Sequence, residues 1–69
     1  MFRVEISLSD ADRLVETIEA MQAWCRDRMI TPATFGYSLA AARTLFRVDF
    51  AETEQAAAFA EHFHGAIVD

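Results

Sequence analysis

Two five-residue segments repeat nearly the same pattern forty-four positions apart. Residues 2–6 read Phe-Arg-Val-Glu-Ile, and residues 46–50 read Phe-Arg-Val-Asp-Phe. If these segments pair as antiparallel strands whose residue numbers sum to 52, their apolar side chains meet on one face. On the other face, Arg3 then meets Asp49, and Glu5 meets Arg47. The repeat therefore predicts two adjacent strands in an antiparallel sheet that buries one face.

An amphipathic pattern follows the first strand, which we expect at residues 2–8. Ser9 is a favourable N-cap, and the helix that it begins ends before Thr31-Pro32, because the residue before a proline is disfavoured in the α region. Trp24 lies at the margin of the apolar stripe. The stripe itself comprises Ala11, Leu14, Ile18, Met21, Cys25 and Met29.

The remaining segments predict two more strands, a second helix and a short C-terminal strand. Residues 33–39 and 44–50 alternate as strands, joined by a turn at 40–43 that lacks typical hairpin residues. The second helix begins near Glu52, with its apolar stripe at Ala56, Phe59, Ala60 and Phe63. Gly65 is expected to close it as the left-handed C′ residue. Residues 66–68 then form a minimal edge strand.

This order predicts an α+β domain over residues 1–69 with the ferredoxin-like split βαβ (βαββαβ) topology. One antiparallel sheet of order 4-1-3-2 carries both helices on one face. That order makes the first and third strands neighbours, as the repeat requires. The alternative is a βαββα fold with a loose C-terminal tail.

The composition of the chain limits the kinds of partner and the cellular compartment that we expect. A chain of 69 residues buries only about 60% of its unfolded surface, so association with another chain would stabilise it. The net charge of -5 argues against nucleic acid as a partner. No apolar run reaches the roughly 20 residues that cross a bilayer, so no membrane association is expected. The single cysteine agrees with a reducing compartment, and we expect a cytoplasmic protein.

The second strand is expected to be an edge that lacks charge. No charged residue occurs from Met29 to Ala42, although edge strands commonly carry charges that prevent pairing with other chains. This pattern favours a homodimer, or strand addition by a protein partner, over the alternative of a short edge covered by a loop. The candidate interface residues are Thr34, Phe35, Tyr37, Leu39 and Trp24.

Residues that could carry chemistry are few, and we predict no catalytic residue, cofactor or bound metal. His62 and His64 lie about 200° apart on a helix, which is poor geometry for one metal ion. Cys25 lies on the apolar stripe with no base signalled nearby, so it is interpreted as a small core residue. The favoured function is a non-catalytic interaction or regulatory module. A small enzyme or metal-binding protein that uses the two histidines stays an alternative.

Residues 10–15, Asp-Ala-Asp-Arg-Leu-Val, resemble the start of the first helix in ACT domains, which sense small molecules. The resemblance implies a further alternative function, an ACT-like sensing module. The sequence departs from that family because it lacks the Gly and Pro of the preceding loop. Heavy-metal-associated domains share the predicted topology, but their paired-cysteine loop is missing. We assign the chain to neither family.

Overall fold

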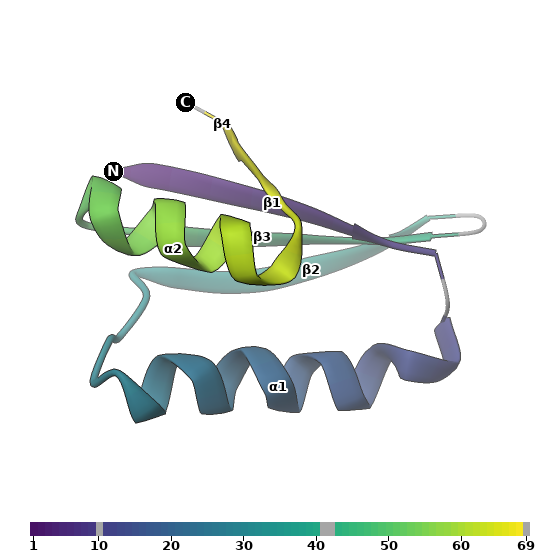
Figure 1. The fold of residues 1–69 in the computed structure, drawn as a ribbon. Helices are drawn as coiled ribbons and strands as arrows, with labels where there is room; N and C mark the ends of the chain where they lie inside the picture. Colours follow the sequence, from purple (N-terminus) through teal and green to yellow (C-terminus); the bar gives the residue numbers. More distant parts are fainter. Residues whose placement is uncertain (10, 41–42, 69) are drawn as a thin grey trace.

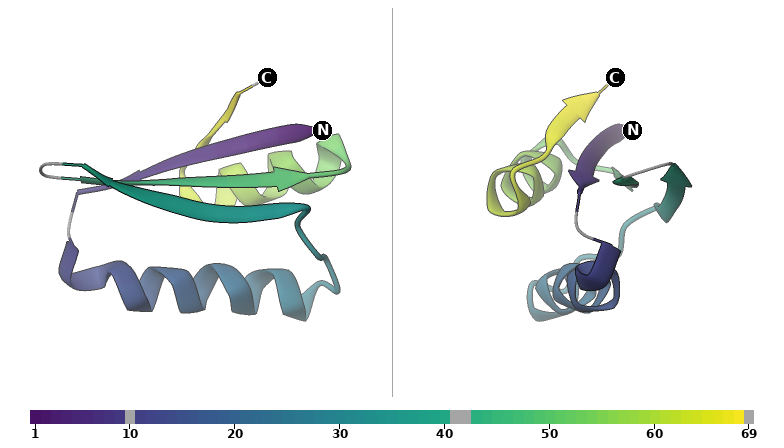
Figure 2. Two further views of the ribbon diagram at one scale, coloured as in Figure 1. Left: turned by 180° about the vertical axis from the view of Figure 1, so that it is seen from behind. Right: turned by 90° about the vertical axis from the view of Figure 1, so that its right-hand side faces the viewer.

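The computed structural model describes residues 1–9, 11–40 and 43–68, with the side chains of Ala11 and Ala40 left out. The sheet has the order β2-β3-β1-β4, and both helices cover one of its faces (Figures 1 and 2). This arrangement confirms the predicted α+β fold of the ferredoxin-like type. Its elements are β1 (Phe2–Leu8), a 3-10 turn (Ala11–Arg13), α1 (Leu14–Asp27), β2 (Thr34–Ala40), β3 (Arg43–Phe50), α2 (Thr53–Phe63) and β4 (Ala66–Val68).

The near-repeat forms the centre of the sheet in the predicted register. Strands β1 and β3 are antiparallel, with Phe2 opposite Phe50 and Val4 opposite Val48. Strand β4 pairs with β1, with Ile67 opposite Val4, so the alternative of a loose C-terminal tail is wrong. The predicted turn between β2 and β3 falls partly on residues 41–42, which lie outside the described residues.

The charged partners of the repeat meet on the sheet face opposite the helices. Arg3 Nε donates to Asp49 Oδ1 at 2.9 Å, and Arg3 Nη2 donates to Oδ2 at 3.3 Å. Arg47 Nε lies 3.7 Å from Glu5 Oε2. The hydrogen bond from Arg3 holds the pKa of the Asp49 carboxyl below its usual value, against the opposing effect of burial.

The core lies between this sheet and the helices. Phe59 of α2 is fully buried, and its ring centroid lies 5.1 Å from that of Phe50 and 5.3 Å from that of Trp24 on α1. Helix α2 packs against β1, β3 and β4. The buried apolar residues are Val4, Ile6, Met21, Trp24, Cys25, Phe46, Val48, Phe50, Ala56, Phe59 and Ala60.

Helix α1 begins later and ends earlier than its sequence pattern predicts. It starts at Leu14 after the 3-10 turn, with Arg13 as an N-cap that forms no side-chain capping bond. At the other end, the N–H of Met29 donates to Arg26 O and that of Ile30 to Cys25 O, which is a Schellman motif. Met29 therefore takes a left-handed conformation, φ 56°, and is 93% exposed. Its predicted place on the apolar stripe is wrong because the helix has already ended.

The end of α2 also differs from the prediction. His64, and not Gly65, takes the left-handed conformation, with φ 58°. Gly65 is required for a different reason, because a β-carbon there would lie 2.5 Å from Ile6 Cγ1 and 3.0 Å from the Glu5 carbonyl oxygen. Close approach of the chain to β1, and not turn conformation, fixes glycine at this position.

Within the described part of the chain, no helix is both long enough and apolar enough to cross a membrane.

Candidate functional site

Among the strands of the described residues, β2 forms one edge of the sheet and has β3 as its neighbour. Its side chains Phe35, Tyr37 and Leu39 lie opposite Val48, Phe46 and Thr44 of β3. Those three β3 residues are buried, so the β2 side chains are on the helix-facing side of the sheet. Three of the five candidate interface residues are thereby brought onto one face of one strand.

The helices cover these β2 side chains incompletely. Tyr37 is 48% exposed and Leu39 is 68% exposed, whereas Phe46 between them and the centre of the sheet is fully buried. The ring centroid of Tyr37 lies 5.8 Å from that of Phe46, and that of Phe35 lies 6.5 Å from it. The aromatic side chains of β2 therefore contact the core on one side and leave apolar surface accessible at the sheet edge.

Thr34 is anchored at the start of the same strand. The Thr34 side chain helps to lower the pKa of the Asp49 carboxyl. The N–H of Ala33 donates to Asp49 O at 2.8 Å, and this bond fixes the beginning of β2 to β3. Thr34 is an exposed member of the candidate set, and it helps to position the strand.

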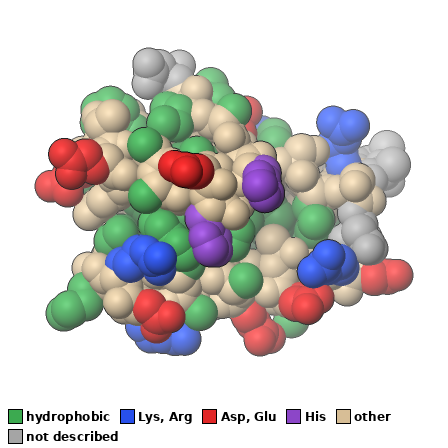
Figure 3. All heavy atoms as spheres, viewed as in Figure 1, with side chains coloured by type: hydrophobic (Ala, Val, Ile, Leu, Met, Phe, Trp, Pro, Cys, Tyr) green, Lys and Arg blue, Asp and Glu red, His purple; other side chains and the backbone are tan. Residues whose placement is uncertain are grey.

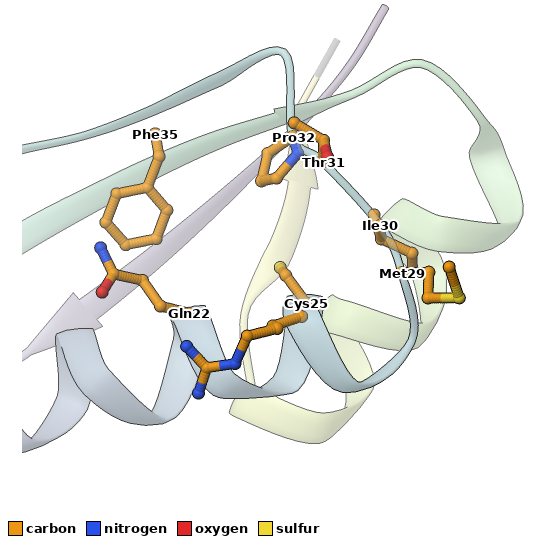
Figure 4. Close-up of a pocket in the computed structure, with 8 residues that line it drawn as sticks. Gln22, Cys25, Met29, Ile30, Thr31, Pro32 and Phe35 are labelled. Atoms are coloured by element: carbon orange, nitrogen blue, oxygen red, sulfur yellow. The ribbon is translucent and has the colours of Figure 1, made fainter.

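A groove of about 700 Å³ lies between the end of α1 and the beginning of β2 (Figure 4). Phe35 points from β2 toward Gln22 of α1, and Cys25 points from α1 toward Pro32. Burial raises the pKa of the Cys25 thiol, and nearby Arg28 only partly offsets this effect. A buried, protonated thiol is a poor nucleophile, so Cys25 acts here as an apolar wall.

Trp24 lies apart from the other candidate interface residues, between the two helices. It is 6% exposed, and its ring centroid lies 6.3 Å from that of Phe63 on α2. The Arg28 guanidinium lies 4.3 Å from the Trp24 ring centroid and donates to the Trp24 carbonyl oxygen. Trp24 thus joins the helices as a core residue, with Arg28 covering its ring. The Trp-x-x-x-Arg spacing was the sequence signal for this contact.

The two histidines lie at the end of α2, and Figure 3 shows both on the face that carries this helix. His62 packs its ring against Trp24 and Phe63, with centroid distances of 6.1 Å and 4.7 Å. His64 follows the helix in the left-handed conformation. The described residues contain no group of three or more histidine, cysteine or acidic side chains that would hold a metal ion.

Sequence reasoning missed the groove because its walls come from separate elements. The residues of the segment that joins α1 to β2 belong to the uncharged run that begins at Met29, and this run was the available signal. Gln22 and Arg26 gave no signal, since exposed polar residues on a helix are usually only solvated.

Comparison with protein-family models, with curated proteins and with solved structures finds no match.

Proposed function

We propose that this protein is a non-catalytic interaction module that forms a homodimer through the free edge of β2. The observation that carries the proposal is the exposure of Tyr37 and Leu39 on a strand that, within residues 1–9, 11–40 and 43–68, pairs on one side with β3. An edge strand presents unpaired backbone N–H and C=O groups, and apolar side chains beside them favour addition of another strand.

The residue pattern of β2 suits pairing with a copy of itself. In an antiparallel pair with a twofold axis at Tyr37, residue numbers across the interface sum to 74. Phe35 then lies opposite Leu39 of the second copy, and Tyr37 lies opposite the second Tyr37. Because all three lie on the helix-facing side, each copy would cover apolar surface left open on the other.

The charge distribution supports the same edge. The chain carries a net charge of -5, which opposes self-association, but β2 itself contains no charged residue. The opposite edge, β4, has three residues, whereas β2 has seven. Strand β2 therefore offers the longer ladder without placing like charges opposite each other.

We also propose that the protein is located in the cytoplasm. Its support is the lone cysteine, whose thiol is unpaired and buried.

Sedimentation velocity over a dilution series tests the dimer. The wild-type chain is expected to dissociate from dimer to monomer on dilution. Tyr37→Lys and Leu39→Lys should shift this transition to at least tenfold higher concentration, because each would place two like charges at the interface. Val68→Lys on β4 is the matched control, since Val68 is also an exposed apolar strand residue.

A wild-type chain that stays monomeric at every concentration would overturn the proposal. Equal weakening by Val68→Lys and Tyr37→Lys would show that β2 is not the interface. Circular dichroism of each variant establishes that the lysine has not simply unfolded the chain.

A further inference from the structure

We propose that the groove between α1 and β2 binds a small apolar molecule that carries a carboxylate. The groove exists within a single chain, so this inference goes beyond the proposed dimer and does not depend on it. Its size, its single charge and the conformation of one residue at its margin support the proposal.

The groove has the dimensions and walls of a small-molecule site. Its volume of about 700 Å³ falls within the range of roughly 300–1,000 Å³ typical of such sites. Ile30, Pro32 and Phe35 supply apolar surface from the connection and from β2, and Cys25 supplies it from α1. An apolar ligand would bury its surface against these side chains.

Arg26 determines the charge that the groove accepts. It is the one charged residue that lines the groove, and it forms no ion pair within the part of the chain that the structure describes. A guanidinium binds a carboxylate through two parallel N–H donors, whereas it repels an amine. Gln22 and Thr31 offer further hydrogen-bonding groups.

Met29 is an independent observation at the same place. Its left-handed conformation, φ 56°, favours glycine, yet the residue is a large apolar one that is 93% exposed and lines the groove. Helix capping does not explain this choice, because glycine would complete the same Schellman motif with less strain. Contact with an apolar ligand gives the exposed methionine side chain a role.

Octanoate is the first probe, with octylamine and octanol as controls of the same chain length. The readout is the rate at which N-ethylmaleimide modifies Cys25, measured by mass spectrometry. Because Cys25 is the only cysteine and lines the groove, the rate of its modification reports on access to the groove. Octanoate is expected to slow the reaction until the effect saturates, and octylamine should have no effect.

Nuclear magnetic resonance separates binding in the groove from a general gain in stability. With octanoate, amide shifts should be concentrated at residues 25–35 and absent from β4. Arg26→Gln should weaken octanoate binding about tenfold or more, as expected for loss of a charge-assisted pair. Arg13→Gln is the matched control, because Arg13 is also an exposed arginine near one end of α1 but does not line the groove.

Three results would overturn the proposal. They are no saturable effect of octanoate, equal effects of octanoate and octylamine, and unchanged octanoate affinity in Arg26→Gln. Protection of Cys25 that grows with protein concentration, needs no probe and persists in Tyr37→Lys, which weakens the proposed dimer, would identify a second copy as the occupant of the groove and would also overturn the proposal. Repeating the titration with Tyr37→Lys separates this result from the dimer, whose own test is sedimentation.

Discussion

Arg3 and Asp49 form a two-point ion pair across the centre of the sheet, with donor-to-acceptor distances of 2.9 and 3.3 Å. At its backbone oxygen, Asp49 also accepts a hydrogen bond from the N–H of Ala33 at 2.8 Å. One aspartate on β3 therefore connects β1, through its side chain, to the beginning of β2, through its backbone. It links the central strand pair to the edge strand that we propose as the interface.

The first prediction concerns acid stability. Because the folded state lowers the pKa of Asp49 below its ordinary 3.8, the ion pair stabilises the fold above that pH. This contribution should be lost as pH falls below 3.8 and through the folded-state pKa. Urea unfolding should show Asp49→Asn less stable than wild type at pH 7, with the difference narrowing in acid.

Glu19→Gln is the control for that experiment, because it removes an exposed carboxyl on α1. It should match wild type at both pH values. A difference between Asp49→Asn and wild type that stays constant from pH 7 to below pH 3.8 would contradict the linkage.

The second prediction compares the two glycines. Gly65→Ala should lower the free energy of unfolding by about 1–3 kcal/mol, because the new β-carbon would meet Ile6 and the Glu5 carbonyl oxygen. Gly36→Ala should change it by less than about 1 kcal/mol, since nothing lies within 4 Å of the added atom. Urea denaturation measures both; equal effects would show that close packing does not explain Gly65.

The third prediction concerns the end of α1. Met29→Gly should stabilise the chain by about 0.5–1 kcal/mol, because glycine adopts the left-handed conformation without steric cost. Met29→Ala should differ from wild type by less than about 0.5 kcal/mol, since it keeps that cost and removes only exposed atoms. Thermal unfolding of the three proteins checks the order, and a destabilised Met29→Gly would contradict it.

The fourth prediction concerns Phe59, whose ring contacts both Phe50 and Trp24. Phe59→Ala should cost about 3–5 kcal/mol, the usual range for removing a buried phenylalanine. A domain of this size has little stability to lose, so the variant should be largely unfolded at 25 °C by circular dichroism. Val15→Ala is the control: Val15 is exposed, and this variant should stay folded.

The predicted register between residues 2–8 and 44–50 was correct because each segment alternates apolar and polar residues and the charges of the two segments are complementary. A shift of one residue would turn the apolar side chains of one strand to the charged face and would separate Arg3 from Asp49. The uncharged run from Met29 likewise predicted that β2 is a candidate interface. Which of the β2 side chains are exposed became evident only in the structure. The groove could not be predicted, because helical spacing does not show which flank of α1 faces β2.

Sequence alone determined the α+β topology, the pairing of the central strands and most of the core, because periodicity shows which faces are apolar. Only the tertiary structure decided the roles of particular residues. Gly65 is glycine because β1 approaches it, Met29 is exposed because the helix ends before it, and Trp24 is buried because α2 packs beside it. Each role depends on a segment distant in sequence or on where a helix stops, and neither is encoded in local periodicity.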